Sequence, residues 1–179
     1  LWRMSGTPLD TGRRRRFRRV RWAVRWSRWT LALTGTVALA GVLLVQRANA
    51  DRAYRMQLAD GEQLMADGQA ARAVQAFARA VALRPGAMVA YYRRGEALAE
   101  LGRLDQASAD LHEAHRLAPE APQPLEALGR LADRRGLADE AARWYADAVS
   151  RTPAPDPKVL YALGLARYQS GAPAAAREP

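Results

Sequence analysis

The fold is decided by residues 128–153, which read LGRLADRRGLADEAARWYADAVSRTP, because the marker residues of this stretch recur along the chain. Gly129 is preceded at intervals of 34 residues by Gly95 and Gly61. The same interval relates the members of four further columns, which are Gly68, Gly102 and Gly136, then Ala73, Ala107 and Ala141, then Ala80, Ala114 and Ala148, then Pro85, Pro119 and Pro153. Five identical columns in three successive units indicate an internal structural repeat.

Each unit is predicted to be a hairpin of two helices. The Gly68 column falls between the two helices, where a turn can require positive φ, and the late proline ends the second helix. The Gly61 column lies inside the first helix and costs that helix about 1 kcal/mol per glycine relative to alanine. Such a cost indicates that the second helix packs very closely there. We expect the large side chains of Phe77, Leu111 and Tyr145 to lie in this contact.

These columns resemble the tetratricopeptide repeat (TPR). The Leu-Gly pair recurs at Leu128-Gly129 and at Leu163-Gly164, and the Ala-x3-Phe element stands at Ala73 and Phe77. The resemblance covers residues 54–179 and implies an all-α solenoid of helical hairpins. Its repeats are residues 54–87, 88–121 and 122–156, followed by a partial fourth repeat, residues 157–179.

The sequence departs from the family pattern in two places. Asp60 and Arg94 stand where the family has leucine before the glycine, so we expect the packing there to differ. The fourth repeat stops before its large second-helix residue, and the first residue is not Met. We therefore expect the chain to be part of a longer protein, with further repeats downstream.

The resemblance also implies a concave groove lined by the first helix of each repeat. The residues expected to bind a partner there are Leu58, Glu62, Met65, Val89, Tyr92, Glu96, Glu126, Arg130, Tyr161 and Tyr168. In the first two repeats this predicts an apolar groove in which two glutamates are stacked. Such a groove suits a protein or peptide segment that carries Lys or Arg beside apolar anchors. It does not suit the acidic C-terminal tails that some family members clamp with Lys and Asn.

Charge divides the chain into two parts. Residues 1–50 contain eleven Arg and one Asp, whereas residues 51–179 contain seventeen basic and seventeen acidic residues. A nucleic-acid-binding array would carry a basic stripe on the folded domain itself. The balanced charge of the repeats therefore argues against nucleic acid as their partner, and an RNA tether that uses the arginine tract is the weaker alternative.

Eighteen consecutive residues without a charge, 29–46, follow the arginine tract. As a helix they would span about 27 Å, close to the thickness of a bilayer core. We therefore expect residues 1–28 to run from a disordered start into a basic amphipathic segment, residues 29–46 to form one transmembrane helix, and residues 47–53 to connect it to the repeats. Trp and Arg favour the headgroup level, and the expected interface residues are Arg21, Trp22, Arg25, Trp26, Arg28 and Trp29.

The arginines in front of this segment predict a cytoplasmic N-terminus. Arg is used almost to the exclusion of Lys, with Lys158 the single lysine, which favours a bacterial source. We therefore expect a single-pass protein of the bacterial inner membrane with extracytoplasmic, periplasmic repeats. The alternative is a secreted soluble adaptor, because Ala48-Asn49-Ala50 matches the small-residue pattern of signal-peptide cleavage.

No pattern of catalytic residues stands out. The chain has no cysteine, and its two histidines, His112 and His115, are one residue closer together than in the H-E-x-x-H zinc motif. We therefore expect no enzyme, no cofactor and no metal site. The predicted function is an interaction scaffold, with envelope biogenesis, secretion or complex assembly as candidate settings.

Overall fold

The computed structural model describes the backbone of residues 12–171 and the side chains of residues 39–171. Within that part of the chain the residues form seven α-helices and no strand. The helices are α1 (Gly12–Ala66), α2 (Ala70–Leu83), α3 (Met88–Glu100), α4 (Leu104–Leu117), α5 (Pro122–Arg134), α6 (Ala138–Ser150) and α7 (Pro157–Gln169). The chain forms two compact units, Leu1–Asn49 and Ala50–Pro179, which are described separately.

The described backbone of the first unit is helical and belongs to α1. The connection expected at residues 47–53 is helical as well, because no glycine or proline interrupts the sequence between Gly41 and Gly61. The expected interface residues Arg21 to Trp29, and residues 29–38 of the expected span, lie outside the residues whose side chains are described.

A membrane-spanning stretch is not found among the described residues, where no helix is both long and apolar enough to cross a bilayer. The side chains described in the second half of the expected span are exposed. They include Leu39, Val42, Leu43, Leu44 and Val45.

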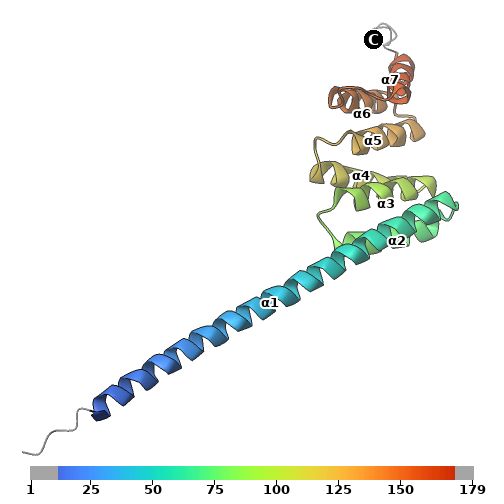
Figure 1. Ribbon diagram of the computed structural model, residues 1–179. Coiled ribbons are helices and arrows are strands. Elements are labelled where there is room, and N and C mark those ends of the chain that lie inside the picture. The colour runs from blue at the N-terminus through green and yellow to red at the C-terminus, as the bar shows by residue number, and fades with distance from the viewer. Residues whose placement is uncertain (1–11, 172–179) are drawn as a thin grey trace, which may run out of the picture. The chain divides into compact units, whose positions relative to one another are not determined.

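The second unit confirms the predicted all-α repeat solenoid for the residues that the structure describes. Figure 1 shows α2 to α7 stacked in chain order. The three turns inside the hairpins have the same geometry, since Gly68, Gly102 and Gly136 have φ of 72°, 73° and 73°. In each turn the N–H of the residue after the glycine donates to the carbonyl five residues earlier, as from Gln69 to Leu64 at 2.8 Å. This bond satisfies a carbonyl that the end of the helix leaves unpaired.

The hairpins are closed by the expected contact between glycine and a large side chain. A Cβ atom added to Gly61 would lie 2.4 Å from the Phe77 ring, and one added to Gly129 would lie 2.6 Å from the Tyr145 ring. At Gly95 the neighbour is the flexible Leu111 side chain, at 2.9 Å. The alanine columns pack beside these contacts, and five of their six members are fully buried, the sixth being 1% exposed.

The second helix of the first two repeats ends ahead of the late proline. The residues that precede Pro85 and Pro119 are extended, with φ and ψ of −142° and 82° at Arg84 and −141° and 79° at Ala118. A proline restricts the preceding residue to such conformations, so the helix stops before it. In the third repeat α6 ends earlier, at Ser150.

The two polar substitutions in the leucine column have different outcomes. Arg94 donates from Nε and Nη2 to the two carboxylate oxygens of Asp110, at 2.6 and 2.7 Å, and Asp110 is 7% exposed. This bidentate pair replaces the apolar contact that the family leucine would make between the helices of the second hairpin. Asp60, by contrast, is exposed at the surface of the first repeat.

Substituting the column glycines with alanine tests the helix contact. Gly61→Ala should destabilise the protein by about 1–2 kcal/mol, because a rigid ring occupies the space that the new methyl group needs. Gly95→Ala should cost less, because the Leu111 side chain can move and alanine favours the helix by about 1 kcal/mol. Urea unfolding followed by circular dichroism measures both. Gly86→Ala is the control, since nothing lies within 4 Å of its added Cβ atom. Equal losses of stability in Gly61→Ala and Gly86→Ala would contradict the close helix contact.

Candidate partner-binding groove

Two adjoining hollows mark the side of the array that the first helices of the repeats form. The first hollow has a volume of about 330 Å³ and is lined by Glu62 and Met65 of α1, Phe77 of α2, and Arg93, Glu96 and Glu100 of α3. The second hollow, of about 120 Å³, is lined by Glu96, Ala99 and Glu100 of α3, Leu111 of α4, and Ala127, Arg130, Leu131 and Arg134 of α5. Both have an apolar floor and charged walls, and they share Glu96 and Glu100.

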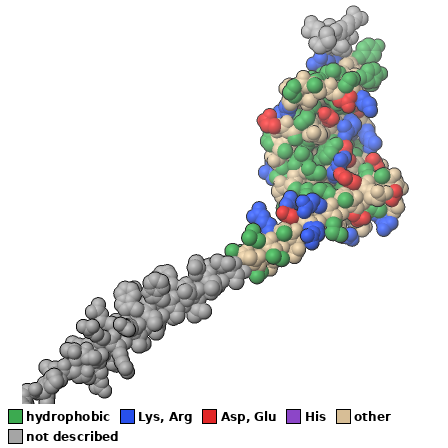
Figure 2. Space-filling model, viewed as in Figure 1, with side chains coloured by type: hydrophobic (Ala, Val, Ile, Leu, Met, Phe, Trp, Pro, Cys, Tyr) green, Lys and Arg blue, Asp and Glu red, His purple; other side chains and the backbone are tan. Residues whose placement is uncertain are grey.

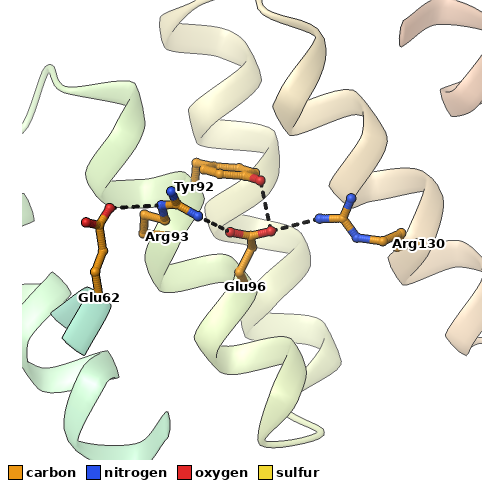
Figure 3. Close-up of polar contacts among 5 residues, drawn as sticks. All are labelled: Glu62, Tyr92, Arg93, Glu96 and Arg130. Carbon is orange, nitrogen blue, oxygen red and sulfur yellow. Dashed lines mark hydrogen bonds and ion pairs between the residues drawn. The ribbon is translucent and has the colours of Figure 1, made fainter. Parts of the chain in front are cut away.

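Glu96 is the centre of a polar network between the two hollows, shown in Figure 3. Its carboxylate accepts hydrogen bonds from the Tyr92 hydroxyl at 2.8 Å, from Arg93 Nη1 at 3.1 Å and from Arg130 Nη2 at 2.8 Å. Arg93 Nε also lies 3.4 Å from Glu62 Oε1. Since Glu62, Arg93 and Arg130 belong to the first, second and third repeats, the network joins three successive hairpins.

This network changes the predicted electrostatics of the groove. The sequence predicts two stacked glutamates open to a basic partner, but an arginine lies between Glu62 and Glu96, and a second arginine pairs with Glu96. Each of the two carboxylates thus has an ion-pair partner within the protein, and Arg93 is shared between them. Acidic and basic side chains are accordingly interspersed on the face of the repeats seen in Figure 2.

Tyr92 is held within the groove wall instead of projecting freely. Its side chain packs against the cluster that contains Leu98, Leu111 and Leu128, while its hydroxyl bonds to Glu96. Burial, followed by the neighbouring Glu96 carboxylate, raises the pKa of the Tyr92 hydroxyl. The hydroxyl therefore stays protonated and keeps donating over the physiological range.

The other predicted groove residues fall into three groups. Glu62, Met65, Glu96 and Arg130 line the hollows. Leu58 is half-buried between the first two repeats, where it packs against the clusters that contain Tyr54 and Phe77. The remaining members lie outside the hollows, and they are Val89, Glu126, Tyr161 and Tyr168.

Among those outside the hollows, Glu126 is half-buried, and its pKa is raised by burial, although Arg130 acts in the opposite direction. Tyr161 and Tyr168 are 74% and 68% exposed on α7. The structure therefore places the predicted aromatic part of the groove at the surface of the fourth repeat.

Three charged residues of the hollows were missed by the sequence prediction, namely Arg93, Glu100 and Arg134. They fall outside the four helix positions that the family resemblance assigns to the groove. The sequence does indicate a groove position for Glu100, because it follows Glu96 by four residues and so lies on the same helix face. Arg134 follows Arg130 by the same interval, and it donates to the Ala99 carbonyl at 2.5 Å.

The two histidines lie on the second helix of the second repeat and contact an indole, away from both hollows. Their rings pack edge-to-face against Trp144 of α6, with centroids 5.6 Å away for His112 and 6.4 Å for His115. Burial, followed by the charges of Arg151 and His112, lowers the pKa of His115. Among residues 39–171, no three His, Asp or Glu side chains gather in a way that could hold a metal ion.

Removing carboxylates from the network tests its role in joining the repeats. Glu96→Ala should cost about 1–3 kcal/mol, because three donors lose their acceptor and the Glu96 side chain is only 25% exposed. Glu62→Ala should cost less than about 1 kcal/mol, since the Glu62 side chain is 52% exposed and makes a single ion pair. Urea titration measures both, with Glu120→Ala, at an exposed position, as a surface control. A loss of stability in Glu62→Ala as large as that in Glu96→Ala would contradict the central place of Glu96.

Comparisons with known proteins agree with this architecture. Residues 89–121 match the family model described as tetratricopeptide repeat. The comparison with curated proteins gives no match. Among solved structures, a crystal structure of MamA has a TM-score of 0.64 at 24% identity, over 69% of this chain and 71% of that one.

Two further solved structures are TPR domains of other proteins. The Sgt2 TPR domain from Aspergillus fumigatus has a TM-score of 0.64 at 16% identity, over 70% of this chain and 84% of that one. The first TPR of Spaghetti (RPAP3), bound to the HSP90 peptide SRMEEVD, has a TM-score of 0.62 at 18% identity, over 69% of this chain and 94% of that one. The hairpin array of this chain therefore has the tetratricopeptide repeat fold.

Proposed function

We propose that this protein is a membrane-anchored interaction scaffold, which presents its groove to a protein or peptide partner outside the cytoplasm. The observation that carries the binding role is the pair of adjoining hollows, with Met65 and Phe77 in the floor of one and Leu111 and Leu131 in the lining of the other. Concave sites with apolar floors and a few polar groups are typical of ligand binding. The proposal gives no residue a catalytic role.

The groove of this chain does not favour an acidic tail like the peptide bound to the RPAP3 domain. At the early groove positions, where a carboxylate clamp uses Lys and Asn, this chain has Leu58, Glu62 and Glu96. A partner carboxylate at Glu62 or Glu96 would meet like charge, and the guanidinium groups of Arg93 and Arg130 are already paired with these glutamates. The preferred partner is therefore of another chemical class.

We base the proposed anchor on the uncharged run of residues 29–46 and on the arginine tract in front of it. Its described part supports the proposal, because five large apolar side chains between Leu39 and Val45 are 53–69% exposed. Exposed apolar side chains on several sides of a helix are unfavourable in water but suit a lipid environment. The charge asymmetry favours a cytoplasmic N-terminus and periplasmic repeats in a bacterial inner membrane.

A soluble secreted adaptor is the second candidate, and one observation favours it. The compact repeat unit begins at Ala50, the last residue of the Ala48-Asn49-Ala50 cleavage pattern. Cleavage after Ala50 would leave Tyr54, the first buried side chain of the repeats, in the released product. The third candidate, an RNA tether, depends on the arginine tract alone.

A reporter fusion combined with fractionation separates these candidates. With alkaline phosphatase fused after Gly171 and the chain expressed in bacteria, we expect activity outside the cytoplasm, in membranes that have been washed at alkaline pH. The mass of the mature protein should show that residues 1–50 are retained.

Activity in the soluble periplasmic fraction, together with a mature N-terminus at Asp51, would favour the secreted adaptor over the anchor. Protein that remains in the cytosol would exclude both. Replacing the arginines at positions 13–16 with glutamate is the control, because weaker positive charge in front of the segment should reduce export of the reporter.

A further inference from the structure

The first hollow has an excess of negative charge. Three carboxylates, from Glu62, Glu96 and Glu100, line it together with one guanidinium, from Arg93. Its floor is apolar, with the half-buried Met65 beside the fully buried ring of Phe77. The hollow therefore combines an apolar surface with a negatively charged rim.

The three carboxylates differ in how well they are satisfied. Glu96 already accepts from three donors, and Glu62 shares Arg93 with it. Glu100 is exposed and has no ion-pair partner within 4 Å among the described residues. Arg134 lines the second hollow with Glu100, but its Nη1 is engaged by the Ala99 carbonyl. Glu100 is thus the carboxylate with most capacity for a new cation.

From this geometry we infer that the first hollow receives a Lys or Arg side chain of the partner, with its aliphatic stem on Met65 and its cation at Glu100. This inference rests on the proposed function and specifies the partner's chemistry. Long basic side chains suit such a site, because they cover apolar surface with their methylene groups while the charged end reaches a polar rim. Glu62, which is 52% exposed, adds a second carboxylate near the entrance.

The second hollow predicts that the partner carries an aliphatic residue near that basic residue. Its lining is balanced in charge, with Glu96 and Glu100 against Arg130 and Arg134, and its apolar part consists of Ala99, Leu111, Ala127 and Leu131. Its smaller volume, about 120 Å³ against about 330 Å³, fits a short aliphatic side chain better than a long charged one. Since Glu100 borders both hollows, the two partner side chains should lie close together in one segment.

Two glutamates that are four residues apart have different roles. Glu96 holds the repeats together, whereas Glu100 recognises the partner. Because the Glu100 side chain is exposed and unpaired among the described residues, Glu100→Gln should leave the fold intact. Glu120→Gln is the matched control, since it makes the same chemical change at an exposed position outside both hollows.

The experiment uses the full chain in detergent micelles and a displayed library of random twelve-residue peptides. We expect the selected peptides to be enriched in Lys or Arg next to an aliphatic residue. Glu100→Gln should weaken the binding of a selected synthetic peptide, raising its Kd at least about fivefold at low salt, as expected for loss of a partly desolvated ion pair. Glu120→Gln should change its Kd by less than twofold. Replacing the peptide's basic residue with norleucine should weaken binding to the parent but not to Glu100→Gln.

Selection of acidic peptides, or of peptides with no charge preference, would overturn this inference and leave the proposed scaffold standing. Equal losses in the Glu100→Gln and Glu120→Gln variants would also overturn it. Failure to capture any peptide would overturn both the inference and the proposed peptide-binding function. If Glu100→Gln lowers the helical circular dichroism, Glu100→Lys assayed with a charge-reversed, glutamate-containing peptide decides the matter, because only direct contact predicts recovered binding.

Discussion

The architecture depends on the close contact between the two helices of each hairpin at Gly61, Gly95 and Gly129. Without a Cβ atom at these positions, the helix backbone lies directly against Phe77, Leu111 or Tyr145 of the second helix. The cost of glycine inside a helix is offset by this packing. Because the contact recurs every 34 residues, equivalent positions of successive first helices become neighbours, and the two adjoining hollows lie along the face that they form.

The charge pairs in the groove result from that stacking of the repeats. Glu96 and Arg130 occupy the same position in successive repeats and pair at 2.8 Å. Arg93 joins Glu62 to the same carboxylate, so most of the charge in the groove is used to hold neighbouring repeats together. What remains for a partner is an apolar floor and the carboxylate of Glu100, which has no ion pair among the described residues, and for this reason the proposed recognition residue differs from the residues that define the network.

The sequence predicted the fold well, because the residues that recur every 34 positions are those that the packing of the helix backbones requires, and this packing repeats with the same period. It predicted the groove only in part. The Glu96–Arg130 pair follows from the repeat interval, but the position of Arg93 between two glutamates depends on side-chain conformations that no column encodes. Arg94 and Asp110 are sixteen residues apart on different helices, so their bidentate pair became visible only in three dimensions. Leu58 was assigned to the groove surface, yet the stacking of the first two repeats half-buries it.

The central claim is that the partner binds the face formed by the first helices of the hairpins. Hydrogen–deuterium exchange of the full chain, with and without a saturating selected peptide, tests it most directly. The account predicts slower amide exchange on binding in residues 54–66 and 88–100, with a smaller effect in residues 122–134. Slower exchange confined to the second helices, α2, α4 and α6, would contradict it.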